Sequence, residues 1–289
     1  MPSVDTTPDD VTIKPRNVMF ARDKQRARWW NGGDPVATAF FNSMSLTFPR
    51  GEAFFIESVR HYRDSVPPEQ QAQIDAFTKQ EAAHSREHAH FNEQVKKAGY
   101  DIAPMEAELA ERIAEMNQAA PIVRLVTTAA LEHFTAIIAH ACLKSGRHFK
   151  GAERDAVRLW QWHAIEEIEH KGVAYDTFLA ATRHLSSYRR WKFRSLVMLS
   201  VSIAFVRARL RAMGRFFDQD GINTPGIWLR TFTYLFIYPG MLRQLIPSWL
   251  AFFRPNFHPW QHDDRHLIDR HLGQLGLPAS GTEAIIKLV

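Results

Sequence analysis

The sequence contains only one cysteine, Cys142, among its 289 residues. A single cysteine cannot form a disulfide within the chain, and it excludes zinc sites built from several thiolates. So few thiols suit a reducing compartment, and we therefore expect a cytoplasmic protein. The first ten residues are polar and acidic, so they do not have the basic and apolar pattern of a secretory signal.

Long apolar runs and strand patterns are also lacking. We find no uninterrupted stretch of about 18–20 apolar residues, the length that a membrane-spanning helix requires. No segment of useful length alternates apolar and polar residues, as a half-buried β-strand would. The pair Gly32-Gly33 is not followed by lysine, so it predicts a turn and not a phosphate-binding loop. The chain is therefore expected to be all-α.

Prolines and glycines divide the chain into helical segments. The predicted helices cover residues 36–46, 49–64, 69–98, 105–117, 121–144 and 152–183. The second and third are joined by a short loop, so they should be antiparallel. Glu52 and Glu81 each lie about 12 residues, or about 18 Å, from that loop, and so at the same height.

The segment at 160–176, WQWHAIEEIEHKGVAYD, has the pattern most suggestive of a functional site. On a helix, His163, Glu167 and His170 fall on one face, with neighbouring side chains about 5–6 Å apart. That spacing allows two imidazoles and a carboxylate to reach one metal ion. Glu166 is also four residues from His170 and competes with Glu167; we favour Glu167 because it forms a Glu-x-x-His pair with His170.

A second segment, KQEAAHSREHAH at 79–90, repeats this chemistry. Glu81, His84 and His88 again share one helix face, and Glu81-x-x-His84 repeats the Glu-x-x-His spacing. Two further apolar segments each carry a lone carboxylate, Glu52 in GEAFFIESV and Glu132 in TTAALEHFTAII. Two lone glutamates plus two Glu-x-x-His pairs form the ligand set of ferritin-like dimetal carboxylate bundles.

We therefore predict a ferritin-like four-helix bundle that holds two metal ions. The expected metal ligands are Glu52, Glu81, His84, Glu132, Glu167 and His170, with His88 and His163 as additional candidates. Glu81 and Glu167 are the expected catalytic carboxylates. Mixed carboxylate and imidazole ligands suit iron best, with manganese or zinc as alternatives.

The last hundred residues differ from the rest. Cations bracket apolar runs between Tyr188 and Phe257, and these runs are too short to span a bilayer. Such a segment could cap the bundle, line a substrate channel, form a homo-oligomer interface or contact a membrane peripherally. Nucleic acid is not an expected partner, because the cations alternate with bulky aliphatic residues and no recognition motif is present. We predict an N-terminal lead at 1–35, partly disordered, a metal-binding bundle at 36–186 and a helical extension at 187–289.

Several motifs resemble the bacterial family of predicted metal-dependent hydrolases. These are GEAFF, QEAAHSREH, LEHFTA, WHAIEEIEHKGVAYD and FHPW, and the resemblance covers about residues 35–265. The ligand pattern is also similar to ferritin-like di-iron oxidases and oxygenases, and its excess of histidine is similar to arylamine N-oxygenases. These resemblances imply a metal-dependent enzyme.

We favour a di-iron enzyme that activates O₂, with the help of a redox partner, to oxidise a small apolar or lipid-like substrate. Apolar and aromatic neighbours such as Trp162 would keep the site dry. The alternative is a metal-dependent hydrolase that uses a metal-bound hydroxide to cleave an ester or amide. A second alternative is a metal-binding bundle without enzymatic activity.

Overall fold

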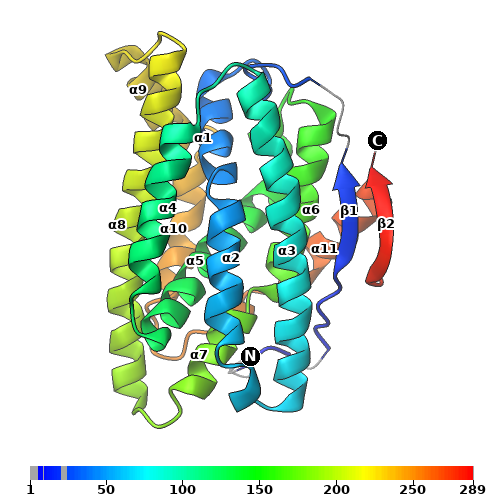
Figure 1. Ribbon diagram of the computed structural model, residues 1–289, viewed down its shortest axis with the longest axis vertical. Helices are drawn as coiled ribbons and strands as arrows, with labels where there is room; N and C mark the ends of the chain where they lie inside the picture. Colours follow the sequence, from blue (N-terminus) through cyan, green and yellow to red (C-terminus); the bar gives the residue numbers. More distant parts are fainter. Residues whose placement is uncertain (1–5, 9, 21–24, 289) are drawn as a thin grey trace.

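A computed structural model describes residues 6–8, 10–20 and 25–288 and confirms the all-α class (Figure 1). Proline occupies the first turn of several helices, where its missing N–H leaves no hydrogen bond unmade. Most predicted helices therefore begin within about three residues of their observed starts. The short helix α1 (Pro35–Ser45) is buried along its whole length. Asp34 is its N-cap, and the Asp34 side chain accepts from two backbone N–H groups.

Four helices pack against one another around the middle of the molecule. They are α2 (Phe48–Arg60), α3 (Pro68–Lys97), α5 (Pro121–Lys144) and α6 (Arg154–His170). The short 3₁₀ turn η1 (Arg63–Ser65) connects α2 to α3, which lie side by side. Helix α4 (Ala103–Asn117) lies in the longer connection between α3 and α5, and it packs on the outside of α2. This arrangement directs side chains from four helices toward one buried centre.

The predicted helix at 152–183 is divided in the structure. Helix α6 ends at His170, and α7 (Val173–Ala181) begins after Lys171 and Gly172. A Cβ atom at Gly172 would lie 2.2 Å from the Thr7 hydroxyl and 3.1 Å from the Trp260 ring. A larger residue would force Thr7 or Trp260 to shift, so glycine allows distant segments to pack closely at this break, which the local sequence does not predict.

Helix α5 is long and apolar enough to cross a membrane by length and composition alone. Glu132 and His133 interrupt its apolar sequence, so it does not form an uninterrupted apolar run. However, 72% of its most apolar window is buried inside the protein. It packs against α2, α6, α7, α8 and α10, as the central helix of a folded core does.

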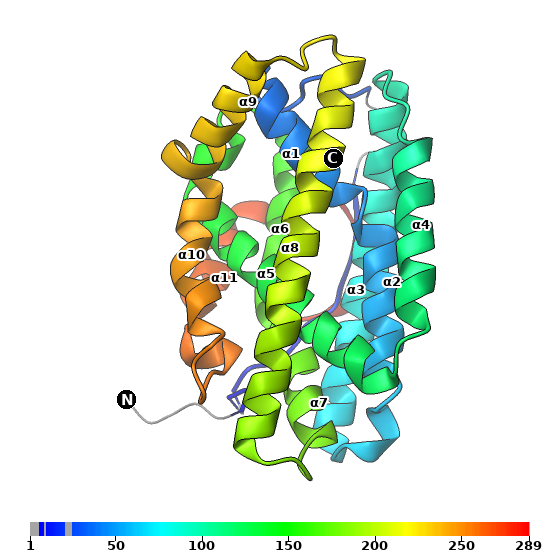
Figure 2. The same cartoon turned by 90° about the vertical axis from the view of Figure 1, so that its left-hand side faces the viewer.

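The C-terminal helices form an outer layer on one side of the bundle (Figure 2). They are α8 (Ser187–Gln219), α9 (Pro225–Phe232), the π-helical turn η3 (Thr233–Ile237) and α10 (Met241–Ala251). The buried guanidinium of Arg209 donates to the Ser43 carbonyl and so fixes α8 to α1. Arg194 donates to the Phe252 and Arg254 carbonyls and fixes α8 to the end of α10.

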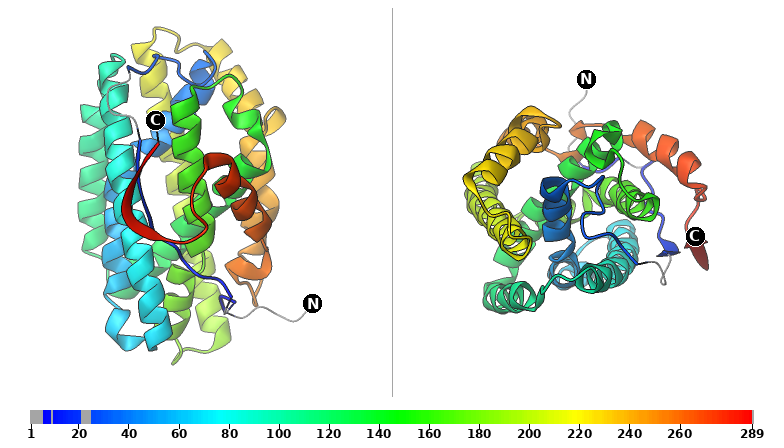
Figure 3. Two further views of the ribbon diagram at one scale, coloured as in Figure 1. Left: turned by 90° about the vertical axis from the view of Figure 1, so that its right-hand side faces the viewer. Right: turned by 90° about the horizontal axis from the view of Figure 1, so that it is seen from above.

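On the opposite side, a two-stranded parallel sheet joins the two ends of the described chain (Figure 3). Strand β1 (Arg16–Phe20) pairs with β2 (Thr282–Leu288), with Val18 opposite Ile286. The sequence analysis missed both strands because they are short and pair over a separation that no local pattern reports. Between β2 and α10, the 3₁₀ turn η4 (Pro259–Gln261) leads into α11 (Arg265–Leu275), which packs on α6. Although Arg16 belongs to the predicted N-terminal lead, its side chain is fully buried.

Candidate metal centre

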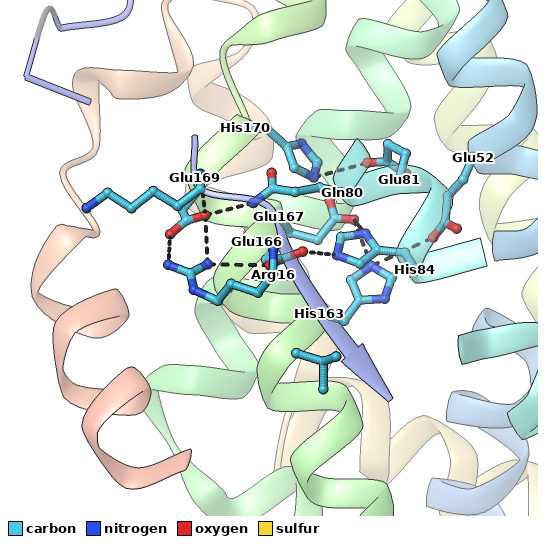
Figure 4. Close-up of polar contacts among 12 residues, drawn as sticks. Arg16, Glu52, Gln80, Glu81, His84, His163, Glu166, Glu167, Glu169 and His170 are labelled. Carbon is cyan, nitrogen blue, oxygen red and sulfur yellow. Dashed lines mark hydrogen bonds and ion pairs between the residues drawn. The ribbon is translucent and has the colours of Figure 1, made fainter. Parts of the chain in front are cut away.

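The four central helices bring the predicted carboxylates and imidazoles together in the interior (Figure 4). Helix α2 contributes Glu52, α3 contributes Glu81 and His84, α5 contributes Glu132, and α6 contributes His163, Glu167 and His170. Each of these side chains belongs to a residue that is at most 3% exposed. Buried ionisable groups at this density require compensation by protons, partners or cations.

Two groups of four side chains each have the geometry to hold a metal ion. The first group contains Glu52, His84, His163 and Glu167, and the second contains Glu81, His84, Glu167 and His170. Within each group, one ligand atom per residue lies within 4.8 Å of every other. His84 and Glu167 belong to both groups, so the two candidate positions are adjacent and share ligands.

Several donor atoms of this centre have no hydrogen-bond partner although they are buried. They are Glu52 Oε1, both carboxylate oxygens of Glu81, His84 Nδ1, Glu132 Oε1, Glu167 Oε2 and His170 Nε2. Native proteins rarely leave buried polar atoms unsatisfied, and the binding of an ion is one of the recognised reasons for such atoms. Carboxylate oxygens and imidazole nitrogens also bind zinc, manganese and iron. The residues therefore fit a metal site.

The contact between His170 and Glu81 shows this geometry most directly. His170 Nε2 lies 3.0 Å from Glu81 Oε1, a separation that suits an ion pair when His170 is protonated and two ligands of one ion when it is neutral. Two ligands at about 2.1 Å from one ion, and at about 90° to each other, lie about 3 Å apart. The other ring nitrogen, His170 Nδ1, lies 3.1 Å from Glu132 Oε2. When Nδ1–H donates to Glu132, the lone pair on Nε2 faces the centre.

Glu132 therefore contacts the centre through His170 and lies outside both four-residue groups. Its second oxygen, Oε1, is buried without a partner and remains able to bind an ion. This position is compatible with the ligand role that the sequence predicts, and it adds a second role, because a carboxylate that accepts from Nδ1–H selects the tautomer and orientation of the imidazole.

Glu166 takes the corresponding place beside His84. His84 Nε2 lies 3.1 Å from Glu166 Oε2, whereas His84 Nδ1 has no hydrogen-bond partner and lies 3.8 Å from Glu167 Oε1. When Nε2–H donates to Glu166, the lone pair on Nδ1 is left for a metal ion. Of the two competing glutamates, the structure thus puts Glu167 in both candidate groups and Glu166 on the outer side of His84.

A hydrogen-bonded chain sets the tautomer of His163. The Ser45 hydroxyl donates to Asn92 Oδ1 at 2.7 Å, so it accepts from His88 Nδ1–H at 2.9 Å. His88 Nε2 then lacks a proton and accepts from His163 Nδ1–H at 2.7 Å. His163 Nε2 faces the centre, where it lies 2.7 Å from Glu167 Oε1 and 3.9 Å from Glu52 Oε1.

His88 was an additional ligand candidate, but the structure places it outside both groups. Both of its ring nitrogens are engaged, one by Ser45 and the other by His163. It reaches the centre only through His163. Sequence spacing could not separate these two roles, because His84 and His88 lie on the same helix face.

The charges of the centre also match divalent cations. Burial raises the pKa of Glu52 and of Glu81 well above the ordinary value, and it raises the pKa of Glu132 to about 7. Neighbouring carboxylates add to the increase for Glu52 and Glu81. Burial also lowers the pKa of His84, which favours the neutral imidazole that ligates metals. Two divalent ions would balance the four carboxylates of the centre.

Arg16 compensates the outer carboxylates, which the sequence analysis did not connect with it. Its guanidinium lies 2.8 Å from Glu169 Oε1 and 3.4 Å from Glu166 Oε1, and Gln80 donates to Glu169 at 2.8 Å. Burial raises the pKa of Glu166 to about 8, with a further increase from Glu169 and an opposing effect of Arg16. No pattern in the sequence indicated Arg16, because it is about 150 residues from its partners.

Replacing Arg16 by glutamine should therefore destabilise the protein by about 3–5 kcal/mol, because it leaves two adjacent carboxylates buried without a cation. Arg63, which pairs with Asp75 at the surface, offers a matched control, and Arg63→Gln should change stability little. Urea unfolding of both variants measures the difference. Equal stabilities for the two variants would contradict the compensating role of Arg16.

Aromatic rings surround the imidazoles. The ring centroid of Trp162 lies 4.9 Å from that of His84, Phe77 lies 5.0 Å from His170, and Phe48 lies 4.5 Å from His163. These contacts exclude water and lower the local dielectric constant, which strengthens every charge interaction in the centre.

A third group that could hold a metal lies away from the centre and has a simpler explanation. His140, His262 and Asp264 are close together, but Lys171 also contacts Asp264 at 2.9 Å. The Lys171 ammonium lies 4.2 Å from the Trp260 ring as well. A lysine ammonium already neutralises this carboxylate, so the group acts as an ionic contact that fixes the chain before α11 to α5 and to the turn after α6.

These features define a helical protein with a buried carboxylate and imidazole centre suited to metal ions. The chain belongs to the family described as predicted metal-dependent hydrolase, whose family model matches residues 14–263. The match begins before β1, so it includes Arg16 as well as the four central helices. No curated protein and no solved structure matches the chain.

The family confirms the resemblance found in the sequence and supports a metal-dependent protein. It favours the hydrolase alternative over the O₂-activating enzyme predicted from the sequence, because the family is described as a hydrolase. The ferritin-like likeness, which no solved structure supports, stays a prediction.

Proposed function

We propose that this protein is a dinuclear metal-dependent hydrolase that cleaves an ester or amide bond of a small apolar substrate. The observation that carries the proposal is the pair of adjacent ligand groups sharing His84 and Glu167. Their buried, unpartnered donor atoms fit two ions, and the family description supplies the reaction class.

Seven side chains would hold the ions: Glu52, Glu81, His84, Glu132, His163, Glu167 and His170. Divalent ions bound here would polarise the substrate carbonyl and lower the pKa of a coordinated water toward 7. Zinc and manganese suit this nitrogen and oxygen ligand set, and so does iron, the metal that the sequence analysis favoured.

The side chains of this centre have separable roles in hydrolysis. Glu81 is the candidate general base, because its Oε2 is buried without a hydrogen-bond partner while its Oε1 contacts His170. One oxygen can bind an ion while the other accepts the proton of the attacking water. Glu167, the other expected catalytic carboxylate, lies in both groups and would hold the two ions in register.

The side chains around the ligands would keep them in place. Glu132, Glu166 and His88 each contact the outer nitrogen of one ligating imidazole. Such partners fix the ring orientation, and their removal typically lowers metal affinity or activity about 10–100-fold. They would allow the centre to bind ions without rearranging the helices.

The test is hydrolysis without O₂. Protein loaded with zinc or manganese under argon should cleave members of a panel of aryl esters and anilides, because hydrolysis needs no change of oxidation state. Glu81→Gln should lower kcat about 100-fold or more, as loss of a general base does. Glu93→Gln, an exposed position on the same helix, is the matched control and should retain the activity.

Two outcomes would overturn the proposal. One is a protein that cleaves no substrate with any metal yet consumes O₂ when loaded with ferrous iron, which would restore the oxidase hypothesis. The other is stoichiometric metal binding with neither activity, which would favour a metal-binding bundle without enzymatic function.

A further inference from the structure

The exposed apolar side chains of this protein are concentrated on the outer C-terminal helices. Among the described residues, thirteen large hydrophobic side chains are exposed, and eleven of them lie between Tyr188 and Leu250. Leu229 is 68% exposed and Ile203 is 60% exposed. Scattered exposed hydrophobic residues need no explanation, but a concentration on one layer marks an interaction surface.

These side chains lie on or beside α8, α9, η3 and α10, which form the outer layer of helices in Figure 2, and we call the outer surface of this layer the α8–α10 face. Trp249 of α10 donates to the Ser202 hydroxyl of α8 at 2.9 Å, so the two helices lie side by side. Ile203 follows Ser202 in α8, and Leu250 follows Trp249 in α10. The view along the bundle in Figure 3 shows the same layer on the outside, on the far side of the bundle from the sheet.

The same segment is strongly basic. Residues 187–257 contain eleven arginines and lysines but only two acidic residues, Asp218 and Asp220. Asp220 is already paired with Arg28 at 2.6 Å. The rest of the chain has 25 basic and 29 acidic residues, so the excess of positive charge lies in this segment. Arg194 and Arg209 are buried and Arg211 and Arg215 contact Glu108, so the remaining cations of the segment carry the surface charge.

Exposed cations lie along the apolar side chains. On α8, Arg189 and Lys192 precede the apolar stretch 196–206, and Arg207 follows it. Arg243 and Arg254 occupy similar positions around α10. The stretch 196–206 would extend only about 16 Å as a helix, which is too short to cross a bilayer. Apolar side chains with flanking cations are typical of a helix that lies in the interface of a membrane.

We propose that the α8–α10 face binds the surface of an anionic lipid bilayer, with α8 lying along the membrane plane. The apolar side chains enter the boundary between headgroups and acyl chains, while the arginines and lysines contact anionic headgroups. A second copy of the chain fits this face less well, because a symmetric contact would oppose basic surfaces. The proposal goes beyond the hydrolase function and does not depend on it.

Flotation of the full-length protein with vesicles tests the proposal. Binding should occur with vesicles of phosphatidylcholine and phosphatidylglycerol, and it should be much weaker with phosphatidylcholine alone. Raising salt from about 0.05 M to about 0.5 M should lower the bound fraction severalfold, because salt screens the headgroup charge. Absence of binding at low salt, or equal binding to both vesicle types, would overturn the proposal.

A pair of variants tests the face itself. Ile203→Glu should weaken vesicle binding about tenfold or more, because it places a carboxylate where an apolar side chain enters the lipid. Ile285→Glu on β2 is the matched control, since Ile285 is 54% exposed on the opposite side of the molecule. Both positions are exposed, so both variants should fold, which circular dichroism verifies.

Sedimentation without vesicles distinguishes a protein interface from a membrane interface. The intact protein should not self-associate through this face, so Ile203→Glu should leave its sedimentation unchanged. If it forms a dimer that this variant dissociates, the face is an interface between copies of the chain and the membrane proposal is wrong. Equal vesicle binding by Ile203→Glu and Ile285→Glu would also contradict it.

Discussion

Replacing Glu167 by alanine should remove both metal ions from the protein, whereas replacing Glu52 should remove only one. Glu167 belongs to both candidate groups, and Glu52 belongs only to the group that includes His163. The second group, which contains Glu81 and His170, keeps all four of its ligands in Glu52→Ala. We therefore expect about two metals per chain in the native protein, about one in Glu52→Ala and close to none in Glu167→Ala. Elemental analysis of each reconstituted protein provides the measurement.

Two control positions make this result specific. Glu57 lies exposed on the same helix as Glu52, so Glu57→Ala should keep both metals. His133 follows Glu132 in α5 but faces α10, where its Nε2 contacts the Ser248 carbonyl at 3.0 Å. His133→Ala should also keep both metals. Equal metal content in Glu52→Ala and Glu167→Ala would contradict the model of two metal positions that share Glu167. If the native protein takes up no metal, the proposed metal centre is wrong.

The metal-free protein should lose stability as the pH rises from 7 to about 8.5, while the metal-loaded protein should lose much less. Burial and neighbouring carboxylates raise the pKa of Glu52 and Glu81, and burial raises the pKa of Glu166 to about 8. The folded state therefore binds more protons than the unfolded state, in which a glutamate has an ordinary pKa of about 4.3. Stability falls with pH wherever the folded state holds the extra protons.

His170 acts in the same direction in the metal-free protein. Its pKa is raised well above 6.5: burial opposes this shift, but Glu132 and Glu167 outweigh it. Its contribution to stability is complete below pH 6.5 and is lost as the pH rises through the raised folded-state pKa. His84 and His88 have lowered pKa values, so they influence the slope only below about pH 6.5. The window above pH 7 therefore reports the raised carboxyl groups and His170 of the centre, together with Glu166 beside it.

Each extra proton held by the folded state corresponds to about 1.4 kcal/mol per pH unit. Bound ions replace the protons of Glu52, Glu81 and His170, which removes most of the slope. Urea unfolding at several pH values, with and without a chelator, measures both slopes. Identical slopes for the two forms would show that these groups do not bind the metal.

Helical periodicity alone placed most of the candidate site. Residues three or four apart share a helix face, so the two Glu-x-x-His pairs could be assigned to inward faces without coordinates. The lone carboxylates Glu52 and Glu132 stood out because each interrupts an apolar segment. The structure gathers all six predicted ligands in one buried region.

Segments distant in sequence determined what periodicity could not. Gly172, at the break between α6 and α7, packs closely against Thr7 and Trp260, and the two strands pair across almost the whole chain. Because these contacts form only in the folded protein, the sequence shows no local sign of them. The predicted N-terminal lead likewise supplies Arg16, the cation beside Glu166 and Glu169.

The sequence by itself determined the helical class, the family and the four helices that face one another, because each depends on local spacing of residue types. Only the tertiary structure decided which atoms of those residues face the centre. Glu166 and Glu167 are adjacent, yet one contacts the outer nitrogen of His84 and the other belongs to both ligand groups. Such roles depend on which group each ring nitrogen or carboxylate oxygen contacts. Ser45, Asn92 and Arg16 make these contacts only when the helices pack.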